Sequence, residues 1–89
     1  MSWQATAWVS TVEAGGASGK LLLYALANYA DETGRTFAGD ERIMRDTELS
    51  ERAVRDWKRR LVEAGLITIE RRRRAGGDFD LDVIRLAMG

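Results

Sequence analysis

The segment that follows Ser50 constrains the fold of this chain more than any other part of its sequence. Apolar residues recur there at helical spacing as far as Ala64, and Gly65 supplies a residue that readily adopts a left-handed backbone. Serine is preferred at the start of a helix because its side-chain oxygen accepts a hydrogen bond from an otherwise free amide. The pattern therefore predicts a helix over residues 51–64, with Ser50 as its N-cap and Gly65 as its stop.

Two strand patterns come after this helix. LITIERR, which begins at Leu66, is rich in β-branched residues, and in DFDLDVIRL the apolar side chains of Phe79, Leu81 and Val83 alternate with aspartates. That alternation is the period of a half-buried strand, and RRAGGD between the two stretches has the composition of a turn. We therefore expect a two-stranded β-hairpin after the helix.

Two helical patterns occupy the first thirty residues. An amphipathic helix is indicated by apolar residues at positions i, i+3, i+4 and i+7, namely Ala5, Trp8, Val9 and Val12. A second helix is expected from an N-cap at Ser18 to about Ala30. Its apolar residues occupy two sides, which predicts a central place in the core.

A turn and a third helix lie between these helices and Ser50. DETGR has the composition of a turn, and Thr36 and Phe37 allow at most a short strand. The acidic pair Asp40 and Glu41 favours a helix start, so a short third helix is expected to run to about Asp46.

Length and composition place the chain among ordinary globular domains. Eighty-nine residues, of which 45% are hydrophobic and 31% charged, are enough for one core, so residues 1–89 are expected to form a single domain. No apolar run approaches the roughly 20 residues that span a bilayer, and MSWQATAWVS lacks the features of a secretory signal. The expected location is cytoplasmic, without a membrane partner.

Residue types that carry much of enzyme chemistry are missing. The chain has no cysteine and no histidine, which excludes disulfides, thiolate metal sites and the commonest general base. The carboxylates are scattered singly among arginines instead of forming a cluster. We therefore expect no catalytic residues, no cofactor, no metal and no small-molecule substrate.

An α+β chain in which a four-residue turn, TELS, joins two helices and a hairpin follows has the architecture of a winged helix-turn-helix. The segments MSWQATAW, LANYADETGRTF and LSERAV with the following AGLI resemble the winged helix-turn-helix domain at the start of many phage, plasmid and bacterial replication-initiation proteins, and in small bacterial regulators. The resemblance covers nearly the whole chain. It implies binding of double-stranded DNA in replication initiation or transcriptional regulation, with a homodimer as a further candidate assembly.

The chain departs from that family at two places. Glu48 stands in the turn where the family usually has a glycine, and Ala38 and Gly39 replace a Pro-Ser pair. A residue other than glycine pays an energetic cost in a left-handed conformation.

The predicted helix over residues 51–64 has two distinct faces. Its apolar side is expected to carry Val54, Trp57, Leu61 and Ala64, and the opposite side to carry Arg52, Arg55, Asp56 and Arg59. Arginine to guanine is the commonest specific contact in the major groove, and a glutamate accepts from cytosine. The residues predicted to read bases are therefore Arg52, Arg55, Arg59 and Glu51, and those predicted to contact phosphates from this helix are Ser50, Lys58 and Arg60.

The same charges also permit a second interpretation. Glu51 with Arg55, Arg52 with Asp56, and Arg59 with Glu63 are spaced at i, i+4, as on a solvated, ion-paired helix face. Against this stands an excess of charge, because residues 52–74 hold nine basic and three acidic side chains.

Four consecutive arginines, Arg71, Arg72, Arg73 and Arg74, precede the turn residues Ala75 to Gly77. Strand residues alternate between faces, so four in succession cannot all be buried or paired. They are predicted to form a wing that reaches phosphates or an adjacent minor groove. The alternative is a charged edge that protects the hairpin from aggregation.

The zero net charge conceals an uneven distribution. Residues 1–40 carry two basic and four acidic side chains, whereas residues 41–74 carry eleven and seven. We expect a basic face toward DNA and an acidic side away from it.

Two other binding patterns fail on inspection. AGGASGKL resembles a phosphate-binding loop, but Ala14 replaces its first glycine and Leu21 its hydroxyl residue, so Gly15 to Gly19 is read as a turn between helices. Trp8 and Trp57 lie on apolar stripes and are expected in the core, while Trp3 is free to be exposed. The chain is therefore expected to lack the exposed aromatic residues that binding of single strands or RNA usually needs. A protein-interaction or dimerisation module remains the alternative to DNA binding.

Overall fold

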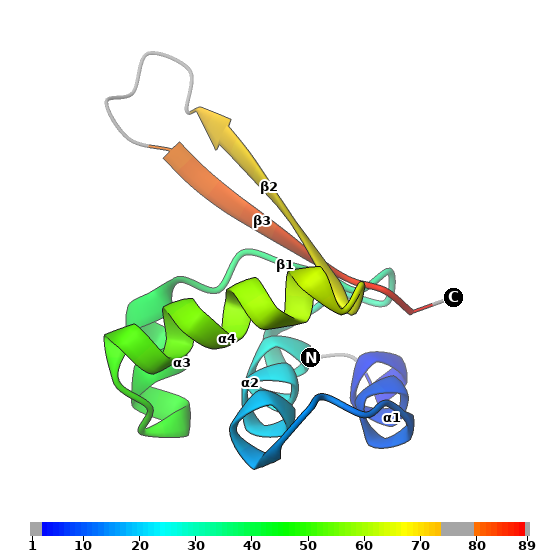
Figure 1. Ribbon diagram of the computed structural model, residues 1–89. Coiled ribbons are helices and arrows are strands. Elements are labelled where there is room, and N and C mark those ends of the chain that lie inside the picture. Colours follow the sequence, from blue (N-terminus) through cyan, green and yellow to red (C-terminus); the bar gives the residue numbers. More distant parts are fainter. Residues whose placement is uncertain (1–2, 74–79, 89) are drawn as a thin grey trace.

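The computed structural model describes residues 3–73 and 80–88, and it contains four helices and three strands in this part of the chain (Figure 1). In chain order they are α1 (Trp3–Thr11), α2 (Ala17–Tyr29), β1 (Arg35–Thr36), α3 (Asp40–Thr47), α4 (Glu51–Glu63), β2 (Ile67–Arg73) and β3 (Asp80–Leu86). The order confirms the predicted α+β class, with four helices before the hairpin.

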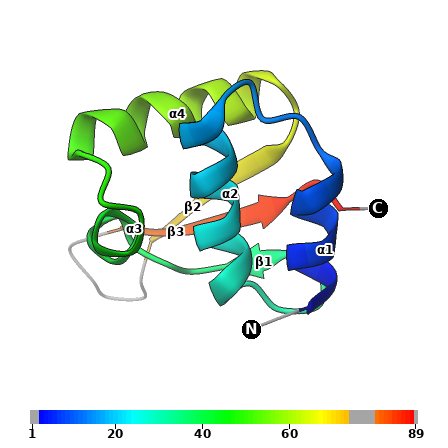
Figure 2. The same ribbon diagram turned by 90° about the horizontal axis from the view of Figure 1, so that it is seen from below.

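The helices gather on one side of a small sheet, and the β2–β3 hairpin extends beyond them (Figure 1). Seen from below, α1 and α2 lie side by side, and α4 runs along one edge of the helical layer (Figure 2). In both views the far end of the hairpin and the amino-terminal end of α4 point to the same side of the molecule.

Helix α2 occupies the centre of the core, as its apolar residues on two sides predict. Its largest buried side chains, Leu22, Leu23 and Leu26, are completely inaccessible to solvent. The same core cluster includes residues from α1, α3, α4 and the sheet: Ala5, Val9, Ile43, Val54, Leu61, Ile67, Ile84 and Leu86. One apolar cluster therefore joins all four helices to β2 and β3.

The sheet is antiparallel with the strand order β1-β3-β2, so β3 is central. Val83 is buried as the alternating pattern predicts, but Ile84 and Leu86, at the alternate positions, join the main core cluster. The central strand has a neighbour on each side, and Val83 is completely buried although it lies outside the main core cluster. Phe79 and the side chain of Leu81 lie outside the described residues.

The short strand is displaced by one residue from its prediction. β1 contains Arg35 and Thr36, which pair with Arg85 and Ile84, while Phe37 lies beyond the strand. The amide of Ala38 donates to the hydroxyl oxygen of the buried Thr36 at 3.3 Å. This contact turns the chain after Thr36 and ends the strand there.

The start of α2 differs from its prediction. The helix begins at Ala17 with Gly16 as N-cap and without a side-chain capping bond, so Ser18 is a helical residue and not the cap. A Cβ atom at Gly19 would lie 2.7 Å from Cζ3 of Trp57. The indole therefore packs directly on the first turn of α2, and the glycines that resemble a phosphate loop make room for it.

The two ends of α4 confirm one prediction each. The Oγ atom of Ser50 accepts a hydrogen bond from the Ala53 amide at 3.1 Å, and Gly65 has a left-handed backbone with a φ of 76°. Ala64, expected on the apolar side, is instead exposed and serves as the C-cap. It lies past the last helical residue, where the chain turns toward β2.

No helix within residues 3–73 and 80–88 is long and apolar enough to cross a membrane.

Candidate nucleic-acid interface

A tight turn connects the end of α3 to the start of α4. Glu48 adopts the left-handed conformation with a φ of 60°, and its amide donates to the Met44 carbonyl at 2.8 Å. The buried Thr47 hydroxyl donates to the Ile43 carbonyl at 2.7 Å and accepts from the Leu49 amide at 3.2 Å. These bonds hold a turn geometry at Glu48 that usually favours glycine.

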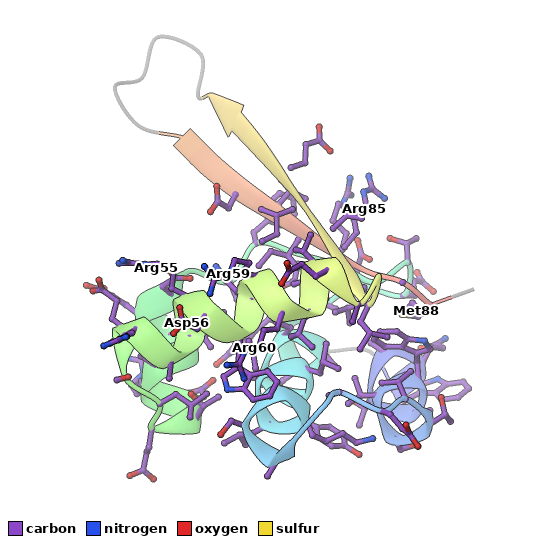
Figure 3. The ribbon with its side chains drawn as sticks, viewed as in Figure 1. Arg55, Asp56, Arg59, Arg60, Arg85 and Met88 are labelled. Carbon is purple, nitrogen blue, oxygen red and sulfur yellow. The ribbon has the colours of Figure 1, made fainter. Side chains whose placement is uncertain are left out.

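Helix α4 separates apolar from charged residues, as its sequence pattern predicts. Val54 and Leu61 are buried in the core, and Trp57 packs partly against it. The exposed residues of α4 include Glu51, Arg52, Arg55 and Arg59, and the Arg52 side chain is 92% exposed. Figure 3 shows Arg55 and Arg59 on the side of α4 from which the hairpin projects.

The exposed arginines of α4 form ion pairs with carboxylates of the same helix. Arg55 binds Glu51 at 2.6 Å, while Arg52 and Arg59 share Asp56 at 3.9 and 3.7 Å. Two of the three i, i+4 pairs expected for a solvated face are therefore present, and Arg59 bonds to Asp56 instead of Glu63. Exposed pairs of this kind contribute only about 0.3–0.5 kcal/mol each, so a phosphate or a base competes with them easily.

The backbone of Arg71, Arg72 and Arg73 belongs to β2, where these residues pair with Asp82, Leu81 and Asp80 of β3. The hairpin thus carries these three arginine positions at its far end. That end lies on the same side of the molecule as the amino-terminal end of α4 (Figures 1 and 2). Arg74 and the predicted tip at Ala75 to Gly77 lie outside the described residues.

A family model for a helix-turn-helix domain matches residues 17–67, which is more than half of the chain. The chain belongs to the helix-turn-helix family. The match runs from the first residue of α2 to the first residue of β2, so it contains α3, the turn at Glu48 and α4. Family membership indicates DNA binding. No curated protein and no solved structure gives a significant match.

Lys58, which is predicted to contact phosphate, is largely buried in the structure. Its side chain is 11% exposed, and its Nζ atom bonds to Oδ1 of Asp40 at 2.5 Å. The residue lies on the buried side of α4 beside Val54 and Leu61, where it ties α4 to the start of α3. A phosphate would have to displace Asp40 from a largely desolvated ammonium group.

Arg60 also lies away from the other arginines of α4. Figure 3 shows its side chain on the opposite side of the helix from Arg55 and Arg59. Its guanidinium group stands over the Trp57 ring, 4.7 Å from the ring centroid. This contact covers the indole and places Arg60 outside the surface shared by α4 and the hairpin.

The sequence interpretation overlooked three exposed arginines, Arg42 and Arg45 on α3 and Arg85 on β3. Arg85 points away from the helices on the outer face of the sheet (Figure 3). The alternation of charged and apolar residues in β3 was the signal for Arg85. In α3, the separation of the buried residues Ile43 and Thr47 from the exposed Arg42 and Arg45 follows helical spacing and could have identified the two arginines.

Histidine and cysteine are absent from the sequence, so the side chains of the usual metal-ligand types in residues 3–73 and 80–88 are carboxylates. Among these residues, no group of three or more histidine, cysteine, aspartate or glutamate side chains is placed to hold a metal ion.

Proposed function

We propose that the chain binds double-stranded DNA as a winged helix-turn-helix, with α4 in the major groove and the β2–β3 hairpin as its wing. The observation that carries this proposal is the position of Arg55 and Arg59, which are exposed on the side of α4 from which the hairpin projects (Figure 3). One duplex can then meet both elements at once.

Within the groove, Arg52, Arg55 and Arg59 are the proposed base-reading residues, with Glu51 accepting from a cytosine amino group. Their intrahelical partners hold the guanidinium groups near the helix surface without burying them. Ser50 keeps a hydroxyl hydrogen for a phosphate oxygen, because its Oγ atom acts as acceptor in the N-cap bond to Ala53.

The wing is proposed to contribute Arg71, Arg72, Arg73 and Arg74 to phosphates or to an adjacent minor groove. Support comes from the strand register, which places the first three at the far end of β2. Lys58 and Arg60 are left out of the proposed interface because of their contacts with Asp40 and Trp57.

The proposed biological role is replication initiation or transcriptional regulation, without catalytic activity. The resemblance of the LSERAV and AGLI segments to replication initiators and small regulators supports this role. A homodimer would be recognised by a palindromic sequence among duplexes selected from a random library.

Fluorescence anisotropy with a labelled duplex, measured over a range of salt concentrations, tests the proposal. Binding should weaken with salt, with a logarithmic slope of about 0.9 for each phosphate neutralised. Replacing Arg71 to Arg74 by alanine should weaken binding to all sequences alike, whereas Arg55→Ala should weaken the selected site most. Absence of binding to any duplex at low salt would favour a protein-interaction module instead.

A further inference from the structure

An open cleft of about 620 Å³ lies between the end of α2, the loop after β1 and helix α3. Among the residues that the structure describes, none that lines the cleft belongs to α4 or to the hairpin. The lining residues are Tyr29, Phe37, Ala38, Gly39, Glu41, Arg42 and Arg45. The cleft is therefore separate from the surface proposed to hold duplex DNA.

Phe37 gives the cleft an accessible aromatic ring, which corrects the expectation that exposed aromatic residues for single-strand binding are missing. The residue is 50% exposed, although a large apolar side chain gains free energy by burial. The Arg35 guanidinium group lies 5.6 Å from its ring centroid, which makes the ring part of a cation-π pair.

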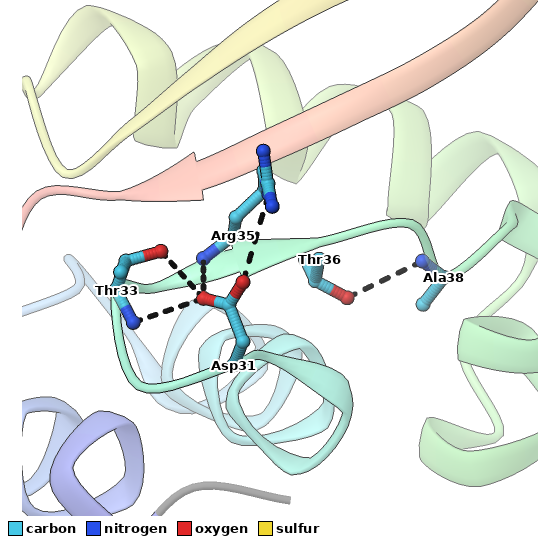
Figure 4. Close-up of polar contacts among 5 residues, drawn as sticks. All are labelled: Asp31, Thr33, Arg35, Thr36 and Ala38. Carbon is cyan, nitrogen blue, oxygen red and sulfur yellow. Dashed lines mark hydrogen bonds and ion pairs between the residues drawn. The ribbon is translucent and has the colours of Figure 1, made fainter.

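The loop that carries Phe37 is held on both sides by hydrogen bonds (Figure 4). Before the strand, Oδ1 of Asp31 accepts from the Thr33 hydroxyl and from the amides of Thr33 and Arg35 at 2.6 to 3.0 Å. After the strand, the Ala38 amide bonds to Thr36. The exposure of Phe37 is thus built into the loop.

Arg42 and Arg45 supply positive charge on the α3 wall of the cleft. The Arg42 guanidinium group lies 5.2 Å from the centroid of the Tyr29 ring, whose hydroxyl donates to Asp46. The hydrogen bond to Asp46 raises the pKa of Tyr29 from its usual value. No ion pair among the described residues involves Arg42 or Arg45, in contrast to Arg52, Arg55 and Arg59.

We propose that this cleft binds a single unpaired nucleotide, with its phosphate against Arg42 and Arg45 and its base against Phe37. A nucleotide presents both a planar π face and an anion, which are the two features that these walls complement. An acidic peptide would satisfy the arginines but would leave the Phe37 ring without a stacking partner. Within the described part of the lining, Glu41 is the only carboxylate, so the two arginines outnumber it.

The nucleotide can come from a single strand of DNA or from a free nucleotide, and the two sources are separable by experiment. Anisotropy of a fluorescein-labelled strand of twelve thymidines measures strand binding at low salt, and unlabelled thymidine monophosphate serves as competitor. Competition at millimolar concentration identifies the free nucleotide as a sufficient ligand. Strand binding without competition identifies the strand.

Substitutions at the cleft give the decisive comparison. Phe37→Ala should weaken binding of the strand at least about fivefold, the lower range for loss of one stacked base, and Phe37→Tyr should retain it. Gly39→Leu should also weaken binding, because Gly39 lines the cleft with an ordinary φ of −79° and a Cβ atom there meets nothing within 4 Å. This variant fills the cleft without backbone strain.

Arg55→Ala is the matched control, because it alters the proposed duplex surface and leaves the cleft intact. It should weaken duplex binding and leave strand binding at the cleft unchanged, while Phe37→Ala should do the reverse. The proposal is overturned if Phe37→Ala and Gly39→Leu bind the thymidine strand as tightly as the unmodified chain, or if neither the strand nor the monophosphate binds. Duplex binding stands or falls separately.

Discussion

Gly19 lies where the Trp57 ring meets the first turn of α2, and a Cβ atom there would approach both Cζ3 of Trp57 and the Ala14 carbonyl oxygen to 2.7 Å. Gly19→Ala should therefore lower the free energy of unfolding by about 1–3 kcal/mol through overpacking. Gly39→Ala is the matched control, because its Cβ atom meets nothing within 4 Å. It should change stability by less than about 1 kcal/mol, because the lower entropy of the unfolded chain is offset by the loss of glycine at the N-cap of α3. Urea denaturation of both variants checks the difference, and equal stabilities would contradict the packing account.

Lys58 provides a second test at the level of a single residue. Because its ammonium group is bound to Asp40 and lies outside the proposed interface, Lys58→Met should leave the duplex affinity of the folded protein within about twofold, while the loss of one partner of the pair should lower stability. Arg59→Ala, one position further along α4, should weaken the same duplex about tenfold, a loss equivalent to one good base contact. A larger loss for Lys58→Met would return this residue to the interface.

The hydrogen bonds of Asp31 predict that acid lowers the stability of the loop that carries Phe37. The hydrogen bond from the Thr33 hydroxyl, followed by that from the Arg35 amide, lowers the pKa of Asp31 from 3.8 to about 2. A carboxyl group whose pKa is lower in the folded state stabilises the fold above its unfolded pKa and loses this contribution on protonation. Stability should therefore fall as the pH decreases from about 4 to about 2, and Asp31→Asn should flatten this part of the profile. Thermal melting at several pH values measures this dependence. The same pH dependence in Asp31→Asn as in the unmodified chain would argue against the hydrogen-bond network.

At the scale of elements, the turn between α3 and α4 holds a non-glycine residue in a left-handed conformation. Glu48→Gly should raise the free energy of unfolding by about 1 kcal/mol, because the strain at a φ of 60° disappears. Glu63→Gly, in the last helical position of α4, should instead lower stability by up to about 1 kcal/mol. If Glu48→Gly destabilises as well, the backbone at this turn differs from the one described here.

The elements themselves were predictable where their signals are local. The N-cap at Ser50, the left-handed Gly65 and the two-sided apolar pattern of α2 depend on residues close in sequence, and all three are confirmed. Lys58 was predicted to contact phosphate, because its partner Asp40 is eighteen positions away and local periodicity does not reveal it. The displacement of β1 likewise depends on pairing with β3 and on the Thr36 hydroxyl, which periodicity does not reveal.

For the whole molecule, the uneven charge distribution matters more than the net charge of zero. Arg55 of α4 and the far end of β2 lie toward one side of the molecule (Figures 1 and 3), and the family match covers α4 but stops at Ile67. The candidate site could therefore be predicted as a set of arginines from sequence. The sequence could not show that Arg42 and Arg45 line a separate cleft, because that cleft is formed only where α3 packs against α2.

The most direct test of the central claim is to map the bound duplex on the protein by nuclear magnetic resonance of backbone amides. The account predicts that a duplex carrying a selected site shifts the amide signals of residues 50–59 and of the far end of β2, while those of α1 remain unchanged. Shifts confined to α1 and α2, with the signals of α4 unmoved, would contradict it.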